Sequence, residues 1–101
     1  MANEPYNLLA RYKMIEEALT DRRLSRGDCV VLSVILAHLD RDGEAYPGLK
    51  RICTRAGISR STAIRAIQNL EFCQYFTTDR TMGRSNYYRI IPREQDEELI
   101  Y

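Results

Sequence analysis

The stretch that decides the fold is LKRICTRAGISRSTAIRAIQNLEF, residues 49–72. Apolar residues in its first part recur at steps of three, one and three, which predicts a short helix of about two turns. These residues are Leu49, Ile52, Cys53 and Ala56. Gly57 then ends the helix, because glycine readily takes the left-handed conformation that follows a helix end. Ile58 is expected to point back into the core, and Ser59 can cap a second helix that runs to about Phe72.

The second helix of this stretch has two different faces when it is projected at about 100° per residue. Its apolar face, within an arc of about 100°, consists of Ala63, Ala66, Ile67 and Leu70. Its opposite face, within an arc of about 60°, consists of Ser61, Arg65, Gln68 and Phe72. Most of this outward face is polar and can hydrogen-bond to base edges or phosphates, so it suits a major groove. Ser59 and Arg60 lie at the helix N-terminus, where free N–H groups favour a phosphate.

Two further helices are expected upstream. Residues 29–39, CVVLSVILAHL, are apolar nearly all round, which is typical of a central helix packed on several sides. Ser25 can cap this helix, with Asp28 favourably placed in its first turn. A first helix can open at Glu4-Pro5, before a break over residues 20–24. Its apolar face is expected to consist of Leu8, Tyr12, Ile15 and Leu19.

Downstream, residues 75–79 and 86–91 are rich in aromatic residues, Thr and Ile and are predicted to be strands. Residues 82–85 form the expected hairpin tip, and residues 41–44 an earlier polar loop. The predicted fold is mainly α with a small β-hairpin: a winged helix-turn-helix of three to four helices and a two-stranded wing. The expected parts are an N-terminal helix (1–23), the winged domain (24–92) and an acidic tail (93–101).

The formal net charge is only +1, but it is unevenly distributed. Residues 1–49 have a balance of −2, residues 50–93 a balance of +7, and residues 94–101 a balance of −4. A basic middle of this kind is typical of a surface that binds a polyanion. The alternative is that the arginines are scattered over a solvated face of an ordinary helical hairpin.

Composition excludes several other classes of protein. A chain of 101 residues with 45% apolar content supports one domain with one core. No apolar run reaches the roughly 18 residues of a membrane span, and MANEPYN at residues 1–7 has no basic region of a secretory signal. The cysteines are odd in number and lack metal-ligand spacing, which favours a reducing cytoplasm and neither metal nor cofactor. His38 is expected to be a hydrogen-bonded histidine of the core or its edge, and no motif supports an enzyme.

The chain from Leu24 to Ile91 resembles the winged helix-turn-helix domains of phage and plasmid replication proteins and related small regulators. The matching stretches are LS (24–25), CVVLSVILAHL (29–39), DGEAYP (42–47), GISRSTAIRAIQNLE (57–71) and GRSNYYRI (83–90). The resemblance implies that the helix after the turn enters the major groove and that the wing contacts the DNA backbone. The DNA-binding positions that it implies are Ser59, Arg60, Ser61, Thr62, Arg65, Gln68, Arg80 and Arg84.

The sequence departs from this family pattern at four positions. Gln74 stands where the family usually has a glycine after the recognition helix, and Gly48 replaces a Ser or Thr cap. Ile64 and Phe72 are apolar where such helices usually carry polar groups. Ile64 is expected to contact a thymine methyl group or a partner chain, and Phe72 is expected to contact protein.

The expected function is sequence-preferring binding of double-stranded DNA, in phage or plasmid transcription regulation or in replication initiation with replication proteins as partners. The alternative is a protein-interaction winged helix whose basic face docks an acidic partner. A homodimer is a further expectation, with the first helix and Leu99-Ile100-Tyr101 as contacts. Its alternative is a first helix that packs entirely on its own core.

Overall fold

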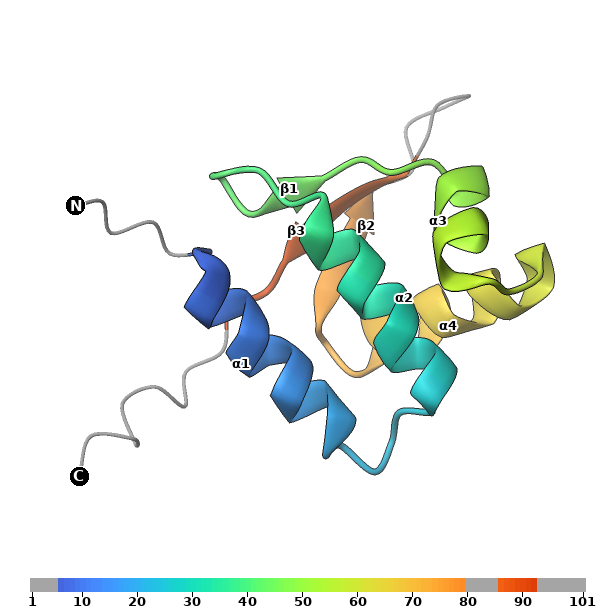
Figure 1. Ribbon diagram of the computed structural model, residues 1–101, viewed down its shortest axis with the longest axis horizontal. Helices are drawn as coiled ribbons and strands as arrows, with labels where there is room; N and C mark the ends of the chain where they lie inside the picture. The colour runs from blue at the N-terminus through green and yellow to red at the C-terminus, as the bar shows by residue number, and fades with distance from the viewer. Residues whose placement is uncertain (1–5, 80–85, 93–101) are drawn as a thin grey trace.

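The computed structural model of the protein describes residues 6–79 and 86–92. Within these residues it has four helices and a small antiparallel sheet, the architecture of a winged helix-turn-helix (Figure 1). The elements are α1 (Leu8–Leu19), α2 (Arg26–Ala37), β1 (Glu44–Ala45), α3 (Leu49–Ala56), α4 (Arg60–Phe72), β2 (Phe76–Asp79) and β3 (Tyr87–Ile90). The predicted fold class is therefore confirmed.

Helix α2 is the central element, as its apolar sequence predicts. A capping box fixes its start: the Ser25 side chain accepts from the Asp28 N–H at 3.0 Å, and the Asp28 carboxylate accepts from the Ser25 N–H at 2.9 Å. The helix packs against α1 on one side and against α3 and α4 on the other (Figure 1). None of the helices in the described residues is long and apolar enough to cross a membrane.

The sheet contains one more strand than the sequence predicts. Its strand order is β1-β3-β2, with β3 antiparallel to both neighbours. Glu44 and Ala45 belong to β1, although residues 41–44 were expected to form a loop. The pairing of Glu44 with Arg89 explains this difference, because the two residues are opposite in register and their side chains form an ion pair at 2.8 Å.

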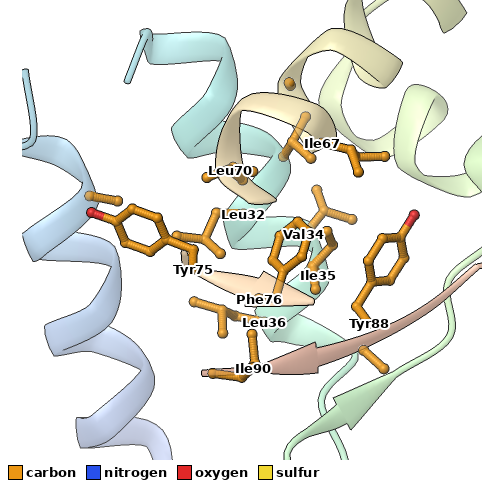
Figure 2. Packing of buried hydrophobic residues seen from close by; sticks show 14 of the residues in the cluster. Leu32, Val34, Ile35, Leu36, Ile67, Leu70, Tyr75, Phe76, Tyr88 and Ile90 are labelled. Carbon is orange, nitrogen blue, oxygen red and sulfur yellow. The ribbon is translucent and has the colours of Figure 1, made fainter. Parts of the chain in front are cut away.

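The core lies between α2, α4 and the inner face of the sheet, as Figure 2 shows. Tyr75 and Tyr88 are fully buried there. Tyr88 meets Phe76 edge to face, with ring centroids 5.2 Å apart. Tyr87 alternates to the outer face, where it is half-buried and stacks on Tyr46.

Helix α1 begins later than expected and shows a different face to the core. Asn7 caps it by accepting from the Ala10 N–H at 2.9 Å, so the helix starts at Leu8 rather than at Glu4-Pro5, which lie outside the described residues. Its buried residues are Met14 and Ala18. The predicted apolar face exists on α1, but it does not face the core: Leu8, Tyr12 and Leu19 are exposed, and only Ile15 packs partly against the core.

The reason for this rotation of α1 is a contact with the end of α2. The Arg11 guanidinium donates to the carbonyl oxygens of Leu36 at 3.3 Å and Leu39 at 3.2 Å. Carbonyls at a helix C-terminus lack partners within the helix, and a cation there is favourable. The side of α1 that carries Arg11, Met14 and Ala18 therefore faces α2.

Candidate nucleic-acid interface

The turn between α3 and α4 is as tight as the sequence predicts. Gly57 has a φ of 71°, and its N–H donates to the Cys53 carbonyl at 2.8 Å. Ile58 packs against the core. Ser59 then accepts a hydrogen bond from the Thr62 N–H at 3.2 Å and starts α4. The three turn residues 57–59 thus fix α3 and α4 against each other.

Helix α4 presents the two faces that its projection predicts. The inner face is buried against α2 and α3, and its residues are Ala63, Ala66, Ile67 and Leu70. The outward face is exposed, and its residues are Ser61, Arg65, Gln68 and Phe72. Arg60 is exposed at the start of the helix. An exposed polar helix face beside a tight turn has the shape and chemistry that a major groove accepts.

A family model described as a helix-turn-helix domain matches residues 22–75. The chain belongs to this helix-turn-helix family. The matched residues include α2, α3 and α4 and end before β2. No curated protein matches the chain.

The predicted site residues of the helix-turn-helix fall into three groups. Arg60, Arg65 and Gln68 make no side-chain hydrogen bond within the described part of the chain, so these side chains are available to a ligand. Ser59 and Thr62 are instead engaged with each other, since the Ser59 hydroxyl donates to Thr62 Oγ1 at 2.9 Å while it caps α4. Ser61 is exposed beside them, 3.4 Å from Ser59 between hydroxyl oxygens.

The predicted wing residues Arg80 and Arg84 lie outside the described residues. The strands that lead to them are described and pair in register up to Asp79 opposite Tyr87. The wing positions therefore remain predictions.

Helix α3 adds a basic surface that the sequence reasoning did not assign. Lys50, Arg51 and Arg55 are all exposed, and Lys50 lies on the side of α3 opposite its buried Ile52. No ion pair involves them among the residues described. Residues 49–70 contain five Lys or Arg and no Asp or Glu. The signal was present in the +7 balance of residues 50–93, but only the folded chain shows that the three bases of α3 are all exposed.

The far end of α4 is held by the loop before α2. The Asn69 amide donates to the Arg23 carbonyl at 3.0 Å and to Asp28 Oδ2 at 2.7 Å. The same Asp28 carboxylate closes the capping box of α2. Asn69 therefore fixes the rotation of α4 about its axis relative to α2, and with it the direction of the outward face.

A second contact with this loop comes from Tyr75, which follows the end of α4. The buried Tyr75 hydroxyl donates to Asp21 Oδ2 at 2.8 Å. Arg23 binds both oxygens of the same carboxylate, at 2.9 and 2.8 Å. These hydrogen bonds, the one from Arg23 first, hold the pKa of Asp21 well below its usual range. The partners are 46 and 54 residues apart along the chain, so no local pattern could have predicted either contact.

The end of α4 itself forms where the sequence places it, although Gln74 replaces glycine. Gln74 has a φ of 67°, in the left-handed region. Its N–H donates to the Glu71 carbonyl, and the Tyr75 N–H donates to the Leu70 carbonyl. This pair of bonds is a Schellman motif, which stops the helix even without glycine.

Proposed function

We propose that this helix-turn-helix protein binds double-stranded DNA with α4 in the major groove. The observation that carries the proposal is that α3 and α4 expose five basic side chains and have no acidic residue over positions 49–70. A surface of this charge attracts the phosphate backbone. The outward face of α4 supplies groups that discriminate between base pairs.

The roles of the residues follow from their positions. Arg65 and Gln68, with Ser61, lie on the outward face and are assigned to base edges, because arginine pairs with guanine and glutamine with adenine in the major groove. Arg60 and the basic residues of α3 are assigned to phosphates, as are Arg80 and Arg84 of the wing. Ser59 and Thr62 act chiefly through the helix cap, whose free N–H groups also favour a phosphate.

The proposed setting is transcription regulation or replication initiation of a phage or plasmid. Both settings require a small domain that binds a particular DNA sequence. Replication initiation would in addition require replication proteins as partners. A domain whose basic face docked an acidic protein would share the charge, but it would not require the base-reading groups on the outward face of α4.

The test is selection of bound duplexes from a random DNA pool, followed by fluorescence anisotropy on the selected sequence and on a random duplex. We expect binding to both at low salt and a clear preference for the selected sequence at physiological salt. Failure to bind any duplex at low salt would contradict the proposal and favour the acidic protein partner. A palindromic selected site would indicate binding as a dimer.

A further inference from the structure

The strongest unexplained feature of the molecule is the exposed side of α1. Leu8, Tyr12 and Leu19 are 80%, 65% and 61% exposed, and Ile15 lies between them. Their steps of four, three and four place all four within an arc of about 60° on the helix surface. Steps of this kind form the apolar seam by which two helices pair in a coiled coil. The described residues cover only Ile15 in part and leave Leu8, Tyr12 and Leu19 exposed.

The two ends of the stripe have complementary shapes. At its N-terminal end Leu8 protrudes, and Leu9 beside it is 61% exposed. At its C-terminal end is an open groove of about 470 Å³ between α1 and α2, lined by Leu19, Leu24, Ser25, Arg26 and Cys29. An exposed leucine at one end and a groove that Leu19 and Leu24 help to line at the other allow each end to meet the opposite end of a copy turned by 180°.

We propose that the protein forms a homodimer through antiparallel pairing of α1 with α1 of a second copy. The twofold axis passes between residues 13 and 14, so that Leu8 of each copy meets Leu19 and the adjoining groove of the other. Tyr12 of each copy meets Ile15 of the other.

Charge does not oppose this direction of pairing. A parallel pair would gain a salt bridge between Arg11 and Glu16, which flank the stripe on opposite sides. The Arg11 guanidinium already donates to the Tyr6, Leu36 and Leu39 carbonyls, so a hydrogen-bonded salt bridge with Glu16 would compete with these bonds. In the antiparallel pair Glu16 lies near Leu9 of the other copy, so no two like charges face each other.

The dimer leaves the proposed DNA surface accessible. Helix α2 lies between α1 and the α3–α4 pair, so the stripe and the outward face of α4 are on different parts of the molecule (Figure 1). The apolar side chains of two stripes would bury about 1,000 Å² in total, at the lower limit for a specific interface. We therefore expect a dimer with a dissociation constant in the micromolar range.

The experiment is sedimentation equilibrium without DNA, on the full chain and on two variants, Leu8→Lys and Leu19→Glu. Each variant alone should raise the dissociation constant at least tenfold, because it places a charge against leucine at both ends of the interface. An equimolar mixture of the two variants should recover the dimer, because the antiparallel pair sets the new lysine beside the new glutamate at one end and leaves two leucines at the other. Lys13→Glu, exposed on α1 but off the stripe, is the matched control.

A wild-type monomer at about 100 µM would overturn the proposal, as would a dimer that neither variant weakens. Failure of the mixture to recover would overturn the antiparallel arrangement, since parallel pairing would leave each charge facing leucine. Circular dichroism of each variant checks that the fold is retained, which the exposure of both leucines favours. None of these measurements involves DNA, so they are independent of the proposed DNA binding.

Discussion

Arg65 is central on the outward face of α4 and makes no side-chain hydrogen bond within the described residues. Arg65→Ala should weaken binding to the selected DNA by about 1–3 kcal/mol and relax the preference at one or two base pairs. Anisotropy titrations on selected and random duplexes measure this. The control is Arg41→Ala, an exposed arginine in the loop before β1. An equal loss on both duplexes would show that Arg65 contacts a phosphate instead.

Asp21 gives the stability of the fold a dependence on pH. Its carboxylate binds Arg23 and Tyr75, and its pKa in the folded state is lowered. This stabilisation is complete above the ordinary carboxyl pKa of about 3.9, and it is lost as pH falls through the lower folded-state pKa.

Asp21→Asn should therefore lower the free energy of unfolding by about 1 kcal/mol at pH 7, because the contact with Arg23 loses its charge. The difference in the free energy of unfolding between the variant and the wild type should become smaller as the pH falls below about 3.9. Urea unfolding at a series of pH values measures both effects. A difference that stayed constant from pH 7 to pH 2 would mean that ionisation of Asp21 does not contribute.

At the level of helices and strands, the basic side of α3 and the wing should contribute separately to the electrostatic part of binding. The triple change of Lys50, Arg51 and Arg55 to Ala should flatten the slope of log K against log salt by about two to three units, at roughly 0.9 per phosphate contact. The double change of Arg80 and Arg84 to Ala should flatten it by about one to two units. For each variant, the decrease in slope should be the same on every duplex. An unchanged slope would show that the mutated element does not contact the DNA backbone.

The helices of the helix-turn-helix could be predicted because their boundaries depend on local chemistry. The capping box of Ser25 and Asp28, the left-handed Gly57 and the Ser59 cap all act within a few residues of the chain. The two faces of α4 could be predicted for a similar reason, since its inner face carries only small and aliphatic residues. In α4, the residues that form the apolar face by their spacing are the same residues that are buried.

For α1, periodicity and burial disagree. Its most regular apolar stripe faces outward, while Met14 and Ala18 face the core because Arg11 holds that side against α2. A one-dimensional pattern identifies an apolar stripe but not the surface that covers it. Strand β1 and the contacts of Asn69 were missed because they depend on pairings more than 40 residues apart. Such pairings are set by the folded chain and leave no local signature.

The folded chain should unfold as one cooperative unit that includes α1. Met14 and Ala18 belong to the same buried cluster as the residues of α2, α4 and the sheet. Urea transitions followed by circular dichroism and by tyrosine fluorescence should therefore coincide. The matched pair of variants is Ala18→Asp, which buries a charge and should cost several kcal/mol, and Glu16→Asp on the exposed side, which should be nearly neutral. Two separate transitions would instead show that residues 1–23 unfold independently of the rest of the chain.

The three free cysteines lie in three different places in this unit. Cys53 is half-buried on α3, Cys29 is buried on α2 with its thiol donating to the Ala18 carbonyl, and Cys73 is buried just after α4. Burial also raises the pKa of the Cys29 thiol, which reduces its reactive thiolate. A thiol-modifying reagent should therefore react first at Cys53. It should react more slowly at Cys29, which lines the groove between α1 and α2 but is buried, and at Cys73, which becomes accessible when the end of α4 opens. The relative rates at Cys29 and Cys73 would therefore show whether the fold opens first near α1 or at the end of α4.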